Sequence, residues 1–400
     1  AALGVYAATG SVHDLYQSTT LTDSRIDGAT GSVLFSTDKG TTWQVLHNFA
    51  HEVAWVATDP ANPNRLYASV VHSTQGGIYV TNNLSAGGGS TWTRLTSPPR
   101  TEGHPLDIMV LNDGSLLASY SGRRNSSGAF TASSGVFLST DGGQTWQART
   151  RNTDANKLNR AILSLVPFAI ATDCGFDTED GYLGQGWYDL TIAVDPVDSN
   201  RVWVGGIEFF RSDDGGVNWG FGSNNVHTDQ HAIVFHPGYD GTGNQTMFVG
   251  NDGGLFKTTN ARAAVGTTTP TPGNCMTGAS AVSWANLNNG YEVTQFYHGA
   301  VYPNGTTYFG GTQDNGTIRG TDGGRNGWGA IRGGDGGYVA VDPTNTNVLF
   351  AENTGLSLIK TTNGNAASPT WVSATNGIAE SSGNFLFIAP FAMDSNSAAR

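Results

Sequence analysis

Two imidazoles and a carboxylate alternate in the stretch 227–231, which reads HTDQH. If this stretch is an extended strand, His227, Asp229 and His231 lie on one face, because residues i, i+2 and i+4 of a strand share a face. Such a set can bind a divalent transition metal ion, and it can equally hold the polar groups of a ligand. A hydrogen-bonded network with a structural role is the third interpretation, and the three stay open.

Three aspartates stand beside glycines, namely Asp252 in GNDGG, Asp314 in TQDNG and Asp335 in GGDGG. Paired carboxylates carry out acid–base hydrolysis of glycosides, and glycine lets a sugar approach the backbone closely. Asp-Gly and Asp-Asn-Gly are also ordinary turn sequences, so a structural role is the alternative. We take Asp252, Asp314 and Asp335 as the candidate catalytic residues.

A repeated motif must position these residues. The pattern Ser/Thr-x-Asp/Asn-x-Gly-x-Thr-Trp is clean at 36–43 (STDKGTTW) and 139–146 (STDGGQTW), and 212–219 (SDDGGVNW) is close to it. Looser copies end at Trp92, Trp284, Trp328 and Trp371. The intervals between these seven copies fit one four-stranded blade of ~40–50 residues plus loop insertions. We expect the aspartate to accept backbone hydrogen bonds in a turn and the tryptophan to pack between blades.

The repeat predicts an all-β fold, a seven-bladed β-propeller of four-stranded antiparallel blades in which residues 1–400 form a single domain. The segment 3–9 (LGVYAAT) resembles a second strand without a first, and 387–394 (FIAPFAMD) resembles a first strand without a second. We therefore expect the C-terminal strand to join the N-terminal blade and close the ring. The alternative is that the chain is a fragment of a longer protein.

Strand alternation separates the loops into two faces. With the strands of each blade lettered A to D from the inside, the B–C loops and the D–A linkers share the face opposite the repeated motif. One register position at the start of strand A carries polar or aromatic residues in five blades: Glu52, Tyr188, Asp229, Gln295 and Asp335. The candidate ligand-binding residues on this face are His227, Asp229, His231, Gln313, Asn315, Trp187, Tyr188, Glu52 and Gln295.

Composition excludes several classes of protein. The chain has 55 Gly, only 13% charged residues and a formal net charge of −12, and its densest basic cluster is Arg123-Arg124. A nucleic-acid partner is therefore not expected. No apolar run reaches the ~18 residues that a membrane helix needs, and no signal peptide is present. We expect a mature, secreted bacterial protein that is a monomer, in which a Cys174–Cys275 disulfide is possible.

These motifs resemble the Asp-box (BNR) propellers, a superfamily that includes sialidases, family 74 xyloglucan hydrolases and sortilin-type receptors. The stretch 227–315 is similar to secreted bacterial proteins described as glycosyl-hydrolase-like or sortilin-like. The sialidase Arg-Ile-Pro motif is absent, since Arg25-Ile26 is followed by Asp27. The family 74 loops are matched in part by 251–257, 313–316 and 334–337, although those enzymes place their cleft between two propellers.

The resemblance implies a secreted, carbohydrate-active, glycoside-hydrolase-like enzyme that degrades a polysaccharide or oligosaccharide. No cofactor would be required, although a divalent metal ion at His227, Asp229 and His231 stays open. The alternative is a propeller that binds a glycan or a protein without turnover.

Overall fold

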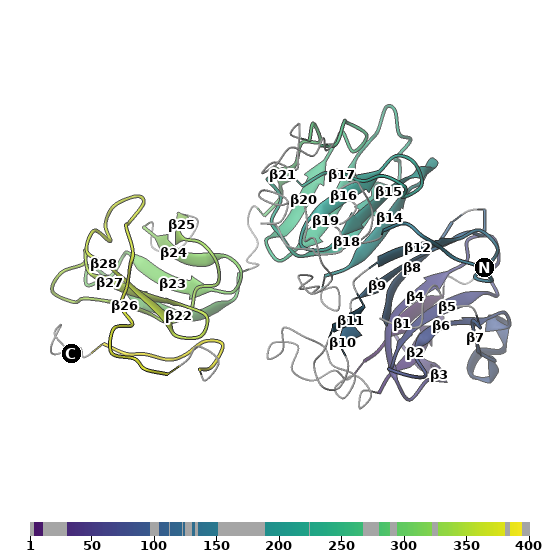
Figure 1. The fold of residues 1–400 in the computed structure, drawn as a ribbon, viewed down its shortest axis with the longest axis horizontal. Coiled ribbons are helices and arrows are strands. Elements are labelled where there is room, and N and C mark those ends of the chain that lie inside the picture. The colour runs from purple at the N-terminus through teal and green to yellow at the C-terminus, as the bar shows by residue number, and fades with distance from the viewer. Residues whose placement is uncertain are drawn as a thin grey trace. The chain divides into compact units, whose positions relative to one another are not determined.

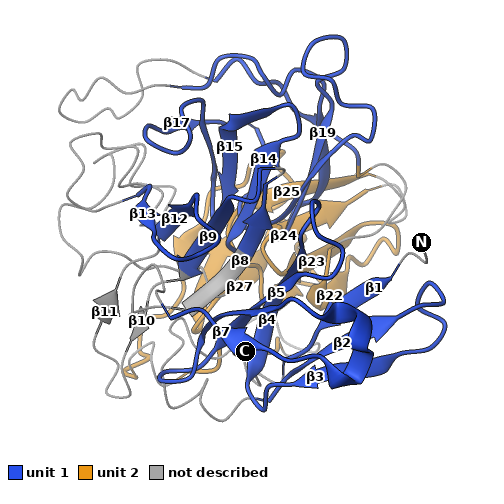
Figure 2. Cartoon of the chain, turned by 90° about the vertical axis from the view of Figure 1, so that its right-hand side faces the viewer, with its two compact units in different colours: residues 1–287 blue, residues 288–400 orange. Residues whose placement is uncertain are grey.

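The computed structural model describes residues 4–10, 30–96, 104–111, 113–121, 123–124, 130–132, 135–150, 189–223, 225–266, 280–288, 294–321, 327–380 and 385–393. The chain divides into two compact units, Ala1–Leu287 and Asn288–Arg400, drawn in two colours in Figure 2.

The described part of the first unit contains five successive antiparallel sheets (Figure 1). The first has three strands, β1 (Val5–Ala8), β2 (Ser32–Ser36) and β3 (Gln44–Asn48). The second comprises β4 (Glu52–Thr58), β5 (Leu66–Val71), β6 (Gly77–Thr81) and β7 (Thr93–Arg94), with the short 3-10 helix η2 (Leu84–Gly89) before its last strand. The third comprises β8 (His104–Val110), β9 (Leu116–Ser121), β12 (Gly135–Ser139) and β13 (Gln147–Ala148). A separate hairpin of β10 (Arg123–Arg124) and β11 (Phe130–Ala132) lies between β9 and β12 in the chain.

The fourth and fifth sheets follow the same order. The fourth comprises β14 (Thr191–Asp195), β15 (Asp198–Gly205), β16 (Phe209–Ser212) and β17 (Gly220–Phe221). The fifth comprises β18 (Gln230–Phe235), β19 (Met247–Asn251), β20 (Gly254–Thr258) and β21 (Ala285–Asn286).

The second unit contains two four-stranded antiparallel sheets in its described residues. One comprises β22 (Phe296–Val301), β23 (Tyr308–Thr312), β24 (Gly316–Gly320) and β25 (Trp328–Arg332). The other comprises β26 (Val339–Val341), β27 (Leu349–Asn353), β28 (Ser357–Thr361) and β29 (Val372–Ser373).

Each hydrophobic core lies between neighbouring sheets rather than within one. Val33 and Leu46 of the first sheet pack against Leu66 of the second, and Trp203 of the fourth packs against Met247 of the fifth. Within the first unit, the first strands β4, β8, β14 and β18 lie successively side by side. Four-stranded meanders that pack face to face with their first strands adjacent are the blades of a β-propeller, so the predicted fold class is confirmed. Fully burying one such large apolar side chain contributes about 1.5–3 kcal/mol.

The repeated motif forms the turn that the sequence predicts. The Asp38 carboxylate accepts hydrogen bonds from the Thr42 N–H (2.8 Å) and the Thr42 hydroxyl (2.7 Å), while the Ser36 hydroxyl donates to it (2.7 Å). Gly40 takes a φ of +88°, which favours glycine. The same contacts recur at Asp141 and Asp214, so these aspartates have a structural role.

Three of the motif tryptophans join neighbouring blades, whereas the indoles of Trp43 and Trp146 donate to carbonyl oxygens of their own turns. The indole N–H of Trp219 donates to the Arg149 carbonyl oxygen (3.2 Å), and that of Trp284 donates to the Gly222 carbonyl oxygen (2.9 Å). In the second unit, the Trp371 indole donates to the Ile331 carbonyl oxygen (3.2 Å). In each case the acceptor belongs to the preceding sheet, which confirms that these tryptophans pack between blades.

Replacing Asp141 with Ala is expected to lower the melting temperature at neutral pH and to have little effect near pH 2. Hydrogen bonds from the Thr145 hydroxyl and N–H hold the pKa of Asp141 at about 2, below its usual 3.8. A carboxyl with a lowered folded-state pKa stabilises the fold above about pH 4, and this contribution is lost as the pH falls toward 2. Thermal melts at both pH values test this; Asp113→Ala, which removes a single turn acceptor, is the control.

The C-terminal part of the chain differs from the prediction. Residues 385–393 form no strand; instead the Ala389 N–H donates to the Glu352 carboxylate (2.7 Å) and the Gly355 N–H donates to the Phe387 carbonyl oxygen (2.9 Å). The buried Glu352 carboxylate also accepts the Tyr338 N–H (3.1 Å). These hydrogen bonds satisfy the buried Glu352 carboxylate, which would otherwise be costly to bury. Ring closure and the single domain therefore stay predictions.

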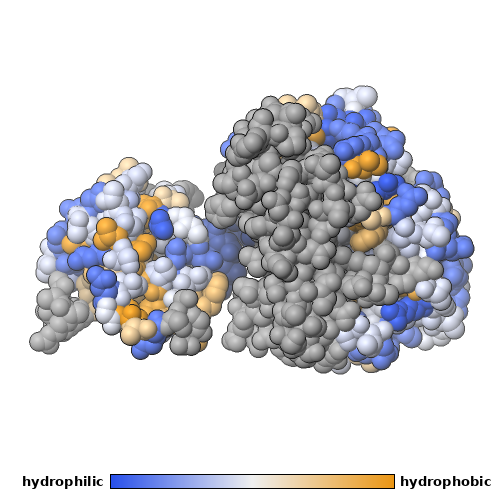
Figure 3. Space-filling view, viewed as in Figure 1, coloured by the Kyte–Doolittle hydropathy of each residue, from blue (hydrophilic) through white to orange (hydrophobic). Residues whose placement is uncertain are grey.

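The described surface is mixed in polarity. On the face shown in Figure 3, hydrophilic and hydrophobic residues are interspersed, which agrees with a chain that has few charges but many small polar residues. Within the described ranges, no helix is long and apolar enough to span a membrane.

Candidate functional site

The loops of the fourth and fifth sheets meet on the face that the sequence selects. The Asp229 N–H donates to the Ile207 carbonyl oxygen (3.0 Å), and the Gln230 N–H donates to that of Gly206 (2.8 Å). The Asp252 N–H donates to the Asp229 carbonyl oxygen (3.3 Å). One linker and two B–C loops thus form one cluster within the first unit, which brings residues 227–231 and Asp252 together.

The alternation assumed for residues 227–231 is wrong. Strand β18 begins only at Gln230, and Asp229 takes a φ of +63°. The left-handed residue turns the chain, so the three side chains do not lie along one extended face. Among the described residues, no group of three or more His, Cys, Asp or Glu side chains is arranged to hold a metal ion.

His231 and Asp252 form a close pair. His231 Nε2 lies 2.7 Å from Asp252 Oδ1, with 35% of the imidazole side chain and 11% of the carboxylate side chain exposed. The two-residue turn of Asp252 and Gly253 between β19 and β20 places the carboxylate beside strand β18. A carboxylate in this position orients an imidazole and stabilises its protonated form, so the pair can take up a proton from a reacting group.

Asp229 lies next to a second carboxyl group. Its side chain is hydrogen-bonded to Asp189, which is fully buried immediately before β14. Burial raises the pKa of Asp229, and the charge of Asp252 raises it further, whereas the contacts with Asp189, His227 and Thr228 lower it. Two carboxyl groups that share a hydrogen bond must hold a proton between them, so this part of the site carries less negative charge than its residue types indicate.

Glu208 is a functional candidate that the sequence reasoning missed. It lies between β15 and β16, and the Ser223 hydroxyl donates to its Oε2 atom (2.5 Å). Burial raises the pKa of Glu208 to about 7, and the neighbouring Asp229 charge adds to the rise. The strand register could have identified Glu208. Val202 and Tyr308 occupy equivalent positions, since each pairs with the first residue of a copy of the repeated motif. Glu208 stands six residues after Val202, just as Asp314 stands six residues after Tyr308.

The second unit brings Asp314 and Asp335 together as well. The Asp314 N–H donates to Asp335 Oδ1 (3.0 Å), and Asp314 has a φ of +58°. The Gln313 N–H donates to the Gln295 carbonyl oxygen (2.9 Å), and the Asn315 side-chain amide donates to the Gln313 carbonyl oxygen (3.0 Å). The Asp335 carboxylate therefore supports a turn, which is the structural alternative considered for these residues.

Glu52 begins β4 in the first unit. Burial raises the pKa of Glu52 to about 7, and its Oε2 atom is buried without a hydrogen-bond partner in the described structure. Next to it, the imidazoles of His51 and His72 lie with their ring centroids 4.2 Å apart. Glu52 thus has the strand position that the register predicts, and its role in ligand binding stays a prediction.

Several predicted residues lie outside the described residues. Trp187 and Tyr188, both candidates for ligand binding, belong to this group, as do Cys174 and Cys275.

The blades and their loops define a protein of the β-propeller class. No family model and no curated protein matches the chain. Among solved structures, it is similar to YCF48 from Cyanidioschyzon merolae (18% identity over 80% of this chain and 88% of that chain, TM-score 0.36). It is also similar to a GH74 xyloglucanase from Xanthomonas campestris (17% identity over 88% of this chain and 53% of that one, TM-score 0.37). A third similar structure is the Cps50 (Swd1) β-propeller domain of Myceliophteria thermophila (8% identity over 84% of this chain and 92% of that chain, TM-score 0.36). The chain spans about half of the xyloglucanase, and these likenesses concern the fold alone.

Proposed function

We propose that the chain is a secreted Asp-box propeller that hydrolyses a polysaccharide at the loops of its fourth and fifth sheets. Glu208 is the general acid, and the Asp252–His231 pair is the base. The observation that supports this assignment best is the burial of Glu208 against Ser223, because burial raises the pKa of this carboxyl to about 7 and such a group can donate a proton at neutral pH.

The proposed reaction uses two proton transfers. The Glu208 carboxyl protonates the glycosidic oxygen as the bond from that oxygen to the anomeric carbon breaks. Asp252, paired with His231, accepts a proton from the water whose oxygen forms the new bond to the anomeric carbon. The Ser223 hydroxyl, which contacts Glu208 Oε2, keeps the acid in one orientation. A second water then relays the proton from Asp252 to Glu208, which restores both groups to their starting states.

The test is hydrolysis by the full chain of a panel of neutral and charged polysaccharides, measured as new reducing ends and, separately, as unsaturated products. New reducing ends without unsaturated products support hydrolysis. Unsaturated products would indicate a lyase, and no product on the whole panel would contradict the proposal.

Replacing Asp252 with Asn is expected to lower kcat by about 100-fold and to leave ligand affinity within a few-fold, because the amide cannot accept the proton from water. Asp240→Asn is the matched control, since Asp240 is an exposed turn residue at the other end of the same sheet. Turnover by Asp252→Asn equal to that of the wild type would remove this residue from the mechanism.

Binding without turnover is the second candidate function. It is favoured by the internal contacts of the two carboxylates, since Asp252 pairs with His231 and Asp335 accepts the Asp314 N–H. In that case the chain would bind an oligosaccharide or a protein without producing new ends, and Asp252→Asn would change affinity alone.

A further inference from the structure

Two buried amide side chains lie under the turn that carries His227 and Asp229. The Asn251 side-chain amide donates to the His227 carbonyl oxygen (3.1 Å) and to Gln230 Oε1 (3.1 Å). The Gln230 amide donates to the same His227 carbonyl oxygen, and its exposed fraction is 0%. The Gly253 N–H donates back to Asn251 Oδ1 (3.0 Å), which ties the turn of Asp252 into the same network.

These hydrogen bonds constrain the backbone next to Asp229, whose positive φ is unfavourable for a residue other than glycine. A non-glycine residue such as Asp229, with a φ of +63°, is held there only where its surroundings fix the conformation. The two amides converge on the carbonyl oxygen two residues earlier, and a buried amide is costly unless its donors are bonded. Loss of either amide would therefore release the turn and change where the Asp229 carboxyl lies relative to Glu208.

We propose that the Asn251–Gln230 amide pair is a positioning device for the active site, which fixes the turn at 227–229 and so holds the Asp229 carboxyl in its place beside Glu208. This inference rests on the proposed function. Neither amide touches the reacting atoms, so both residues are positioning residues, and they act through the turn at 227–229.

The experiment compares the wild type with Asn251→Ala and Gln230→Met, the second of which keeps the side-chain volume. We expect kcat to fall by roughly 10–100-fold with an unchanged KM, since a small misplacement of a catalytic group can have this effect. We also expect the Glu208 carboxyl, followed by NMR without substrate, to titrate at a lower pH in both variants, because the Asp229 charge that raises its pKa moves away.

Asn244→Ala is the matched control. It also removes two amide-donated contacts, to the Gly238 carbonyl oxygen and to His236 Nδ1, at the opposite end of the same sheet. If Asn251→Ala does not fold, the titration of Glu208 in Gln230→Met alone tests the inference. Unchanged titration of Glu208 in the folded variants would overturn the inference even where the wild type is an active hydrolase. A shifted titration in a protein that hydrolyses nothing would support the positioning and reject the proposed hydrolase.

Discussion

Replacing Glu208 with Gln is expected to lower kcat for polysaccharide hydrolysis by about 10²–10⁴-fold, which is the range over which general acids contribute. The substitution removes the acidic proton but keeps the size of the side chain and its contact with Ser223. Substrate affinity should change little, because the amide still accepts and donates hydrogen bonds. Steady-state kinetics on the best substrate of the panel measures both quantities.

The pH dependence of the wild type follows from the same group. Burial and the Asp229 charge raise the pKa of Glu208 to about 7, so the acid form is present below pH 7 and is lost above it. We expect kcat/KM to fall about tenfold per pH unit on the alkaline side, and this alkaline limb should be absent in Glu208→Gln. Glu380→Gln, at an exposed position of the second unit, is the control and should keep the wild-type profile.

An alkaline limb that persists in Glu208→Gln would assign the titration to another group. Full activity of that variant would show that Glu208 is not the acid, and Asp314 or Asp335 would then be the remaining candidates on the predicted face.

The scaffold was readily predicted because its signals are local. Ser36, Asp38 and Gly40 specify one turn within five residues, and the same chemistry repeats in register along the chain. Strand alternation then follows from the repeat, which is why the sequence places Asp252 and residues 227–231 in neighbouring loops. The C-terminal segment was harder to predict, because residues 385–393 make a long-range hydrogen bond to Glu352 that no local pattern indicates.

The site was predicted in part, since its chemistry depends on contacts between blades. The pattern HTDQH reads as a strand, but the left-handed Asp229 is stabilised by Asn251 and by the Ile207 carbonyl oxygen, which lie far away in the sequence. Glu208 shares the register position of Asp314, but the register does not show which side chains of a loop are buried. Its burial against Ser223 and Asp229 is a tertiary property, and that burial is what makes it a candidate acid.

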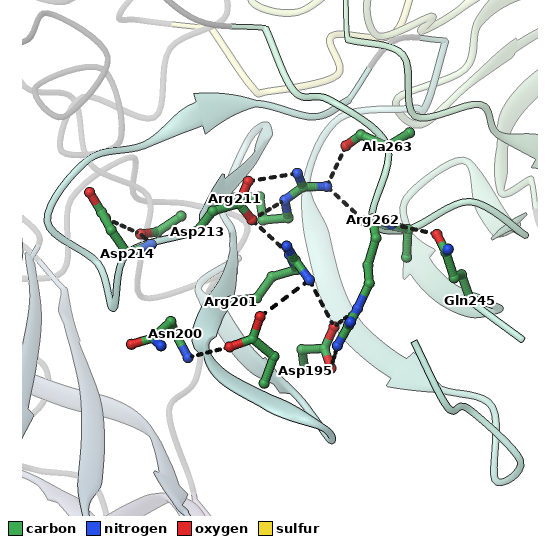
Figure 4. A network of polar contacts seen from close by, with 12 residues as sticks. Asp195, Asn200, Arg201, Arg211, Asp213, Asp214, Gln245, Arg262 and Ala263 are labelled. Carbon is green, nitrogen blue, oxygen red and sulfur yellow. Dashed lines mark hydrogen bonds and ion pairs between the residues drawn. The ribbon is translucent and has the colours of Figure 1, made fainter. Parts of the chain in front are cut away.

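Replacing Arg262 with Met is expected to lower the free energy of unfolding by about 3–5 kcal/mol, which is the usual loss when one partner of a buried ion pair is removed. Arg262 donates from Nη2 to Asp195 Oδ1 (2.7 Å) and from Nε to Asp195 Oδ2 (2.8 Å), as Figure 4 shows. The Asp195 side chain is fully buried, whereas 20% of the Arg262 side chain is exposed. Methionine would leave a buried carboxylate without its main counter-charge.

The contact joins two blades, so its loss should affect their packing together. Asp195 ends β14 in the fourth sheet, and Arg262 follows β20 in the fifth. The Tyr239 hydroxyl also donates to Asp195 Oδ2 (2.6 Å), while Arg201 Nη1 lies farther away at 3.8 Å. Chemical denaturation measures the free energy of unfolding. The double variant Asp195→Asn/Arg262→Met should recover part of the lost stability, because it removes the uncompensated charge of the Asp195 carboxylate.

Arg65→Met in the second sheet is the matched control. Arg65 contacts the buried Asp59 carboxylate through one 3.2 Å pair and donates from Nε to Asn82 Oδ1 (2.7 Å), and 36% of its side chain is exposed. Because Asp59 also accepts the Ala61 N–H (2.8 Å), a smaller loss than in Arg262→Met is expected. A loss in Arg262→Met no larger than in Arg65→Met would show that the Asp195 contact contributes little to the joining of these blades.

The response to pH separates loss of the ion pair from loss of packing. Burial raises the pKa of Asp195, but hydrogen bonds from Arg262 and Tyr239 outweigh it and hold the pKa below 3.8. A lowered folded-state pKa gives stability that is present above pH 3.8 and is lost as the pH falls below it. Wild type and Arg262→Met should therefore differ most near neutral pH and converge in acid, whereas a packing defect alone would leave the difference unchanged at every pH.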